Sequence, residues 1–265
     1  MKRFGRAALV LFLFSCVALA PARAYAQADE IQVYDGGLAP KGIFNLTWHN
    51  NWIPKGSTTP AFAGGVVADK SFTGVAEWAL GVTSFFEAGL YLPLYSYDKN
   101  IGWGINGFKL RTLFAIPNAD TRTFFYGANM EFSYNAERWD SARVTSEIRP
   151  IIGWHLGKVD VIANPIVDTA YDGWGTMTFV PAFRLAYGAS PSWAIAAESY
   201  SDFGAFNDLK SGAEQSHQLF GVISYTGKFV LELGVGFGLT DASDSLTVKS
   251  IFAIDLNKKP VKWLK

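Results

Sequence analysis

The sequence contains little of what would let an exported protein of this size be held by disulfides or cross a membrane as helices. Cysteine occurs once, at Cys16, so no disulfide can form within one chain. Beyond the amino-terminal segment, no stretch offers the roughly 18 uninterrupted apolar residues that a transmembrane helix needs. Histidine occurs three times, and the formal net charge is zero. A strongly basic nucleic-acid-binding surface is therefore excluded.

Apolar and aromatic residues are nevertheless abundant. Hydrophobic residues make up 49% of the chain and aromatic residues 15%, with 26 glycines and 9 tryptophans. This content is high for a secreted domain that is surrounded by water on all sides. Strands that alternate apolar and polar side chains can hide such a surface in lipid. The composition therefore favours a protein that meets the membrane through strands.

The amino terminus has the organisation of an export signal. A short basic stretch precedes an apolar run at 7–14 that is too short to span a bilayer. The small-x-small pattern at 24–26 predicts that residues 1–26 are a signal peptide that is removed. Lipoprotein processing at Cys16 is an alternative, which the bulky Phe14 opposes. Cleavage would leave 19 basic against 23 acidic residues, a net charge of −4, and predicts no nucleic acid partner.

Two alternating stretches meet at a tight turn between residues 77 and 94. Trp78 and Leu80 lie on one face of the first stretch, and Leu90 and Leu92 lie on the same face of the second. The opposite face carries glutamates, small residues and a tyrosine. A period of two indicates β-strands, and one wholly apolar face indicates lipid on that side and a wet lumen on the other.

The same alternation recurs in twelve segments between residues 42 and 256. Long polar connections alternate with tight turns, as in outer-membrane barrels with short periplasmic turns. A sheet in lipid must close, because an open edge leaves unsatisfied backbone groups in hydrocarbon. We therefore predict an all-β fold, a closed antiparallel transmembrane β-barrel of about twelve strands at 42–256. Residues 27–41 are predicted to be a periplasmic lead-in and residues 257–265 a basic periplasmic tail.

Some features oppose this interpretation. A secreted β-sandwich also alternates, although it would not show the loop parity. Pro93, Pro150, Pro165 and Pro181 lie inside predicted strands, where each removes a ladder donor, so they are expected near strand ends or bulges. The predicted strand at about 217–225 is apolar on both faces. This indicates either contact with a lumen plug or a wrong register.

Charged residues of both signs occupy the inward-facing positions of the predicted strands. Opposite charges on one enclosed surface should pair across neighbouring strands. They can line a selective path or satisfy one another and close the lumen, and the sequence supports both interpretations equally. The candidate lumen-lining residues are Glu77, Glu87, Lys109, Arg111, Glu131, Glu147, Arg149, Asp168, Arg184, Glu198, Glu232 and Lys249.

No pattern predicts a catalytic, cofactor or metal site. The histidines, His49, His155 and His217, fall on three separate predicted strands. Ser216 precedes His217, but adjacent side chains of a strand point to opposite faces. The glycine pattern at 102–107 formally matches a dinucleotide fingerprint, but a loop precedes it and a strand follows it. A non-enzymatic protein is therefore predicted.

The hairpin at 81–93 resembles the G-x-T-D-R-x-E-L-G-x-x-x-P hairpin of outer-membrane barrels grouped as meta-pathway phenol-degradation proteins or transporters. Residues 84–85 are Ser-Phe where that pattern has Asp-Arg, so the chain resembles a divergent member. The resemblance implies passive movement of small, often hydrophobic or aromatic, solutes across the outer membrane. The matching residues are Gly81, Thr83, Glu87, Gly89 and Pro93.

The sequence thus predicts a channel or transporter in the bacterial outer membrane. The expected partners are outer-membrane lipids, the export and barrel-assembly machinery and a small-molecule solute. A first alternative is a structural or surface-interaction barrel with a closed lumen, working through the long loops at 54–71 and 203–215. A second is an outer-membrane lipid-modifying enzyme.

Overall fold

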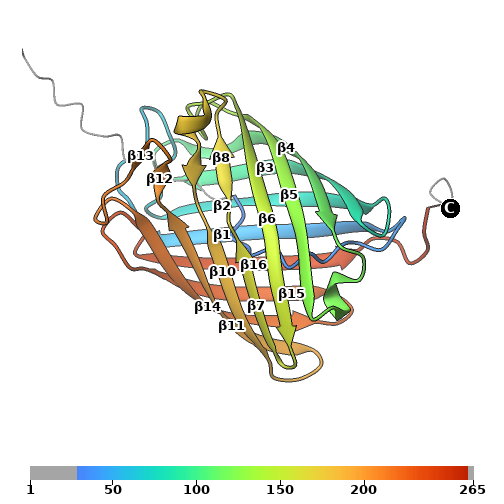
Figure 1. Cartoon of the computed structure of the whole chain (residues 1–265). Helices are drawn as coiled ribbons and strands as arrows, with labels where there is room; N and C mark the ends of the chain where they lie inside the picture. The colour runs from blue at the N-terminus through green and yellow to red at the C-terminus, as the bar shows by residue number, and fades with distance from the viewer. Residues whose placement is uncertain (1–28, 262–265) are drawn as a thin grey trace, which may run out of the picture.

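The computed structural model describes residues 29–261, which form one closed antiparallel barrel (Figure 1). Pairing of the first strand, β1, with the last, β16, closes the barrel, and consecutive strands such as β6 and β7 pair around the rest of it. The strands are β1 (Phe44–Lys55), β2 (Ser71–Gly81), β3 (Phe86–Asp98), β4 (Gly102–Ala115), β5 (Phe124–Asn135), β6 (Val144–Leu156), β7 (Val159–Asn164), β8 (Val167–Thr169), β9 (Thr178–Phe179), β10 (Ala182–Gly188), β11 (Trp193–Asp202), β12 (Gly204–Ala205), β13 (Asp208–Leu209), β14 (Ser216–Thr226), β15 (Val230–Gly238) and β16 (Leu246–Asp255).

Four barrel strands are interrupted, so the sixteen segments form a twelve-stranded barrel. β7 and β8 follow one another along β6, and β9 and β10 lie beside them. β12 extends β11, and β13 precedes β14 in the same way. The predicted all-β fold and its strand number are confirmed.

Two short 3-10 helices lie in connections, η1 (Ala119–Thr121) and η2 (Trp174–Thr176). Within residues 29–261, no helix is long and apolar enough to span a membrane.

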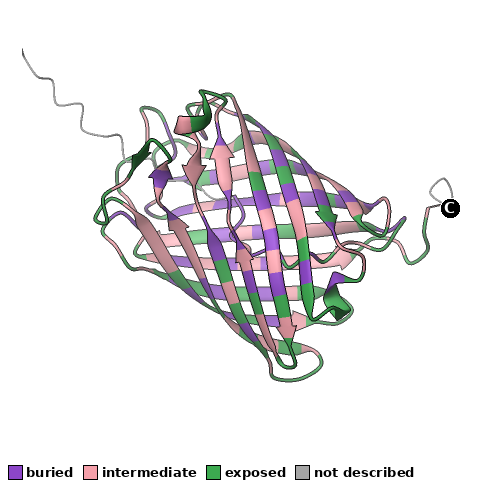
Figure 2. Ribbon diagram, in the orientation of Figure 1, coloured by how far each residue is buried: buried purple, intermediate pink, exposed green. Residues whose placement is uncertain are grey.

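The alternation of side chains explains why the outer face of the barrel wall is exposed and its inner face is buried. Outward-facing Trp48, Leu110 and Phe237 are 49%, 51% and 57% exposed, whereas their inward-facing neighbours are buried or partly buried. Figure 2 shows this as alternating exposed and buried bands along the strands. An apolar outer face and a polar inner face are what a barrel in lipid requires.

All four strand prolines lie at bulges or breaks of the ladder, where a donor is not needed. Pro93 lies at a bulge, where the register of β3 shifts against its neighbours between Tyr91 and Leu94. Pro165 and Pro181 lie in the interruptions between β7 and β8 and between β9 and β10. Pro150 lies within β6 and pairs with Ala128 of β5, but on its other side it faces the break between β7 and β8, since β6 pairs with β8 up to Ile148 and with β7 from Ile152.

The bulge at Pro93 also explains why the predicted outward orientation of the Leu94 side chain is wrong. The sequence places Leu94 outward with Leu92, but Leu94 is only 1% exposed and packs inside with Tyr91 and Val75. A bulge inserts a residue and changes the phase of the alternation. Both Leu92 and Pro93 are exposed as a result.

Connections at the two ends differ in length, broadly as predicted. The end at which β1 finishes, here called the loop end, carries the connections 56–70, 136–143, 170–177 and 239–245. The opposite end, here called the turn end, has shorter ones such as that between β6 and β7, except for 116–123, which was predicted as a tight turn but is as long as 136–143 and contains a short helix. The long loop expected after the third strand is wrong, since β3 ends at Asp98 and β4 begins at Gly102.

The termini depart from the predicted layout. Residues 29–41 were expected to be a lead-in outside the barrel, but they run inside it to the turn end, where Lys41 bridges to Gly81. Residues 257–261 pack at the turn end through Asn257, whose side chain donates to Gly42 O at 3.0 Å. The predicted signal peptide and the last tail residues lie outside the described residues.

Candidate functional site

Residues 29–41, here called the plug segment, are held in the lumen by polar contacts from the wall. Asp29 lies 2.8 Å from Lys109 Nζ, and the Asp29 carbonyl accepts a 3.0 Å hydrogen bond from Asn51 Nδ2. Further along, Lys249 Nζ donates to Ile31 O at 3.0 Å, and Arg149 donates to Gln32 O, also at 3.0 Å. Side chains of the wall therefore form hydrogen bonds with backbone groups in the middle of the plug segment, where no strand pairs with it.

Tyr34 is the centre of the plug segment. Its N–H donates to Asn164 Oδ1 at 2.7 Å, and Asn164 Nδ2 donates back to Tyr34 O at 3.1 Å. The Tyr34 hydroxyl lies 2.6 Å from the Tyr91 hydroxyl. The guanidinium of Arg149 lies 4.5 Å from the centre of the Tyr34 ring. A buried tyrosine with its hydroxyl satisfied and a cation on its ring is a strongly held anchor.

The turn end of the plug segment is held by the hairpin that carries the resemblance motif. The N–H of Ala39 donates to Glu87, and the N–H of Gly42 donates to Gly81 O at 2.6 Å. A Cβ at position 81 would collide with the carbonyl oxygens of Ala39 and Pro40. Glycine at this position allows the close approach of two backbones.

Apolar side chains of the plug segment pack against the inner wall on two sides. Ile31 contacts Phe220 and Val222 of β14, and Val33 joins a cluster with Phe125 on β5. The inward residues of the strand that is apolar on both faces thus cover a plug. Of the two interpretations left open by the sequence, the plug is confirmed.

The charged residues of the lumen form two groups. The first, here called the balanced cluster, lies on β10, β11, β15 and β16. Lys249, fully buried, lies 2.5 Å from Glu198 and 2.8 Å from Glu232. Arg184 also pairs with Glu198, and lies 2.8 Å from Glu232. Two cations and two carboxylates therefore neutralise one another.

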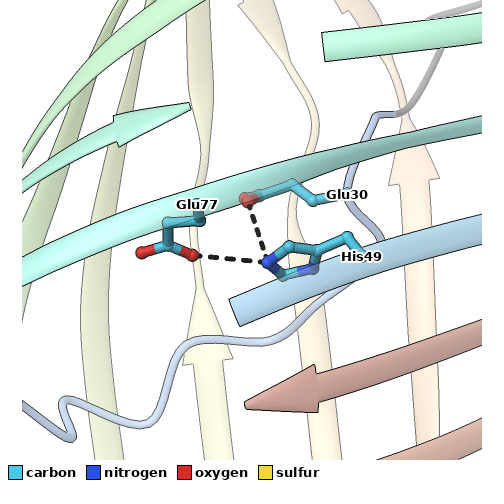
Figure 3. A group of neighbouring side chains, drawn as sticks. All are labelled: Glu30, His49 and Glu77. Atoms are coloured by element: carbon cyan, nitrogen blue, oxygen red, sulfur yellow. Dashed lines mark hydrogen bonds and ion pairs between the residues drawn. The ribbon is translucent and has the colours of Figure 1, made fainter. Parts of the chain in front are cut away.

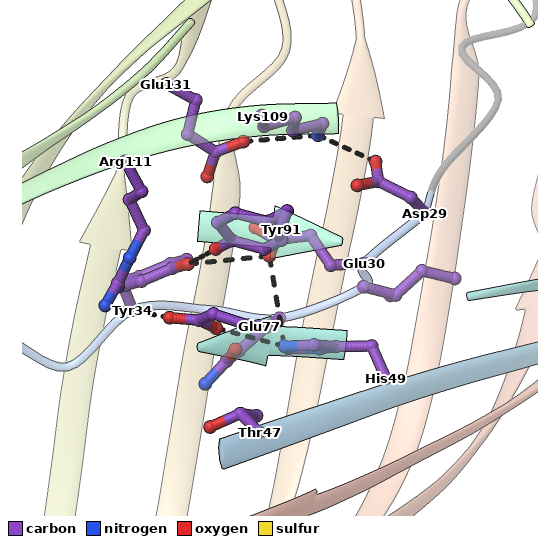
Figure 4. A network of polar contacts seen from close by, with 12 residues as sticks. Asp29, Glu30, Tyr34, Thr47, His49, Glu77, Tyr91, Lys109, Arg111 and Glu131 are labelled. Carbon is purple, nitrogen blue, oxygen red and sulfur yellow. Dashed lines mark hydrogen bonds and ion pairs between the residues drawn. The ribbon is translucent and has the colours of Figure 1, made fainter. Parts of the chain in front are cut away.

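The second group, here called the acidic network, surrounds the plug segment (Figure 4). Arg111 pairs with Glu87 and lies 2.8 Å from Glu77, while Lys109 lies 3.2 Å from Glu131. Its carboxylates outnumber its cations by seven to three. The members are Asp29, Glu30, Glu77, Glu87, Glu131, Glu147, Asp168, Lys109, Arg111 and Arg149.

All twelve candidate lumen-lining residues lie on the inner face, in these two groups. Eight are buried, and the other four, Lys109, Glu147, Asp168 and Arg184, are partly buried. In this conformation they contact one another and the plug segment. The sequence missed the plug residues, since a polar start and paired glycines indicated a segment outside the barrel. The available signal was the inward apolar face of the strand at 217–225.

The loop end is partly covered by two connections. Val66 and Trp139 pack with the inward-facing side chains Tyr91 and Leu94, and the N–H of Val66 donates to Arg138 O at 3.0 Å. The plug segment thus lies beneath a second layer of side chains.

Two aspartates accept hydrogen bonds from the backbone of the connection 56–70 and hold it in place. The N–H of Ser57 donates to Asp244 Oδ1 at 3.0 Å, and the N–H of Gly56 donates to Asp69 at 3.4 Å. Burial, together with the charge of Asp69, raises the pKa of Asp244, although the Ser57 bond opposes this. Partial desolvation would raise the pKa of Asp69, but the Gly56 bond and Lys99 hold it below its ordinary value.

A groove of about 560 Å³ lies on the wall beneath the connection 170–177. Outward-facing Leu110, Met130 and Ile148 line it together with Tyr171 and Trp174. Trp174 is 84% exposed. Lipid-facing apolar side chains next to exposed aromatic rings are typical of the place where a barrel meets the membrane interface.

The histidines lie in three different settings. His49 is buried beside Glu30 and Glu77, and His155 lies 2.7 Å from Asp160. His217 Nδ1 lies 2.8 Å from Ser201 Oγ, and Nε2 lies 3.1 Å from Gln215 Oε1. A serine–histidine pair is present, but the group that orients its imidazole is an amide, whereas hydrolases use a carboxylate.

No family model and no curated protein matches the chain. Solved structures match its fold. The COG4313 outer membrane channel from Pseudomonas putida F1 has 12% identity and a TM-score of 0.57, over 86% of this chain and 100% of that chain. The NanC porin has 9% identity and a TM-score of 0.51, over 81% and 99%. The KdgM porin in complex with disordered oligogalacturonate has 7% identity and a TM-score of 0.50, over 80% and 99%. The chain therefore has the fold of outer-membrane channel barrels.

Proposed function

We propose that this protein is a channel of the bacterial outer membrane for small solutes, closed in this conformation by its own plug segment. The observation that carries the proposal is the way the plug is held. Its middle is bound by side chains of the wall and belongs to no strand, so its departure leaves every rung of the barrel ladder in place. A displaceable segment in an intact barrel is suited to gating.

The wall behind the plug is suited to water. Buried polar groups cost free energy when they lose their partners, roughly 1–3 kcal/mol each. Without the plug, Asn51, Asn164 and Lys109 would lose contacts to it. Entering water replaces these contacts, so an opened lumen fills with water and conducts ions.

The wall charges favour neutral or cationic solutes. The twelve candidate residues comprise seven carboxylates and five cations. The KdgM porin was solved with an oligogalacturonate, which is a polyanion; a wall with net negative charge suits such a ligand poorly. The hairpin resemblance adds a preference for small hydrophobic or aromatic solutes.

Two other functions have less support. A structural barrel with a permanently closed lumen would not need a plug that lies outside the hydrogen-bonded ladder of the barrel strands. A lipid-modifying enzyme would need a catalytic group beyond the pair Ser201 and His217, whose partner Gln215 has no negative charge to stabilise an imidazolium as a carboxylate does.

Conductance in planar bilayers tests the proposal. The mature chain beginning at Gln27 is compared with a variant that lacks residues 27–38 and keeps the contacts of Ala39–Lys41 with the wall. We expect rare, brief openings for the first protein and steady conductance for the variant. A variant that lacks residues 258–265 is the control and should behave as the mature chain. A plug-deleted barrel that inserts without conducting would identify a closed structural barrel.

Ion selectivity is the second readout of the same experiment. Under a salt gradient, the reversal potential of the plug-deleted channel should show cation preference, because carboxylates outnumber cations on the wall. The double substitution Glu131→Gln and Glu147→Gln should abolish this preference. Anion selectivity of the plug-deleted channel would contradict the proposed lumen.

A further inference from the structure

Three metal-ligand side chains meet between the plug segment and the wall (Figure 3). Glu30 comes from the plug segment, His49 from β1 and Glu77 from β2. His49 Nε2 lies 3.3 Å from Glu77 Oε2 and 4.0 Å from Glu30 Oε2. One ligand atom from each residue lies within 4.8 Å of the others, and all three residues are buried. Atoms spaced in this way can surround one small cation.

The second oxygens of both carboxylates are already oriented. Glu77 Oε1 lies 2.8 Å from Arg111, and Glu30 Oε1 lies 3.1 Å from Arg149. Each arginine leaves the other carboxylate oxygen directed toward His49 Nε2. Metal ligands in proteins are commonly held by such outer contacts, which fix the geometry before the ion binds.

The residues around the cluster carry an excess of negative charge, which a bound cation would reduce. The acidic network has seven carboxylates against three cations. The balanced cluster on the other side of the lumen has two of each. Unneutralised carboxylates are costly in an enclosed interior of low dielectric. A divalent cation among them removes part of this excess.

We propose that Glu30, His49 and Glu77 bind a divalent transition-metal ion of the Zn²⁺ type, which joins the plug segment to the barrel wall. Zn²⁺ takes imidazole nitrogens and carboxylate oxygens as ligands, and a water molecule can complete a tetrahedral site with three protein ligands. The hard ions Mg²⁺ and Ca²⁺ prefer oxygen ligands alone. The histidine therefore favours the transition metal.

An imidazolium between two carboxylates is the competing explanation of the same geometry. The imidazolium would contribute one positive charge at this position, whereas a divalent metal ion contributes two. The metal differs in requiring a neutral imidazole with Nε2 free as a ligand. His49 Nδ1 makes no hydrogen bond within the described part of the chain, so the ring can keep its proton there.

Metal titration tests the site directly and does not depend on conductance. The refolded mature protein is stripped with chelator in detergent, then titrated with Zn²⁺ and with Co²⁺. We expect one equivalent of Zn²⁺ to bind, and Co²⁺ to give the visible absorption of a tetrahedral site. His49→Gln and Glu30→Gln should each weaken Zn²⁺ binding by at least about tenfold. His155→Gln is the matched control and should leave binding unchanged.

Folding of each variant is checked by circular dichroism and by the gel mobility of the unheated barrel. Glu30→Gln changes a residue outside the strands, so it keeps the test valid if His49→Gln fails to fold. Absence of stoichiometric Zn²⁺ binding to the mature protein would overturn the inference. Binding that survives both substitutions would overturn it equally.

The consequence for gating rests on the proposed channel function. Bound Zn²⁺ should hold the plug in place, so chelator should increase the open probability of the mature channel, and Zn²⁺ should reverse this. If Zn²⁺ binds but conductance does not respond, the metal site stands and its gating role fails. If Zn²⁺ does not bind, the metal site fails whatever the conductance shows.

Discussion

The single residue most dependent on its partners is Lys249. It is fully buried, and its ammonium contacts Glu198, Glu232 and the plug carbonyl of Ile31. Lys249→Met removes the charge and keeps most of the volume, but leaves two buried carboxylates with Arg184 alone. We expect a loss of about 3–5 kcal/mol in the free energy of unfolding. Urea titration of the detergent-folded barrel measures it.

The matched control for this change is Lys99→Met. Lys99 pairs with Asp69 at 3.4 Å, but its side chain is 49% exposed. Exposed ion pairs contribute only about 0–1 kcal/mol, so the free energy of unfolding should scarcely change. Equal losses for the two substitutions would show that the balanced cluster is not the stabilising unit described here.

A second prediction at the residue scale concerns Tyr34. Tyr34→Phe keeps the packed ring and removes the 2.6 Å hydroxyl contact with Tyr91. Loss of about 1 kcal/mol of plug binding should raise the open probability roughly fivefold. Single-channel recording measures this. Tyr126→Phe, on the lipid-facing wall, is the control, and an unchanged open probability in Tyr34→Phe would show that this contact does not hold the plug.

Among the connecting elements, the loop 56–70 should respond to pH. Burial raises the folded-state pKa of Asp244 above 3.8, so the closed loop binds this proton more tightly than the open loop. Lowering the pH from neutral toward 3.8 should therefore strengthen loop closure. The opposite contribution of Asp69, whose folded pKa is lowered, is lost only below that range.

Hydrogen exchange of residues 56–70 measures this effect, as protection factors corrected for the intrinsic rate at each pH. Asp244→Asn keeps an oxygen that accepts the Ser57 hydrogen bond and removes the titration. Protection in this variant should not depend on pH in the same range. Greater protection of the original loop at neutral pH than at pH 5 would contradict the assignment.

The strands could be predicted from sequence because the alternation of side chains depends only on residues that are neighbours in the chain. A period of two fixes which side chains face lipid, as Phe108 and Lys109 show on β4. Leu94 was misplaced because a bulge changes the phase, and a bulge is set by both neighbouring strands.

The plug segment could not be predicted in the same way. It has no period and no ladder, so its place is determined by residues distant in sequence. Tyr34 contacts Asn164, and Ile31 contacts Lys249. The meeting of Glu30 with His49 and Glu77 could not be predicted for the same reason. His49 and Glu77 are on neighbouring strands and were predicted to face inward, but Glu30 joins them only once the plug is inside.

At the scale of the whole molecule, closure results from two layers inside one complete barrel. The plug segment occupies the lumen, and Val66 and Trp139 cover it from the loop end. The barrel ladder includes neither layer. The fold can therefore remain intact while the lumen opens, which is the basis of the channel proposal.

The central claim is that residues 29–41 lie inside the lumen, and cross-linking in the native membrane tests it most directly. A mature chain from Gln27 has no cysteine, so Tyr34→Cys and Asn164→Cys introduce the only pair. Because the backbone of Tyr34 lies 2.7 Å from the Asn164 side chain, a short bis-maleimide should join the two cysteines within one chain. A second pair, Tyr34→Cys with Tyr126→Cys on the lipid-facing wall, should not react. Efficient joining of only the first pair is the predicted result, and its failure in a folded barrel would contradict the plugged lumen.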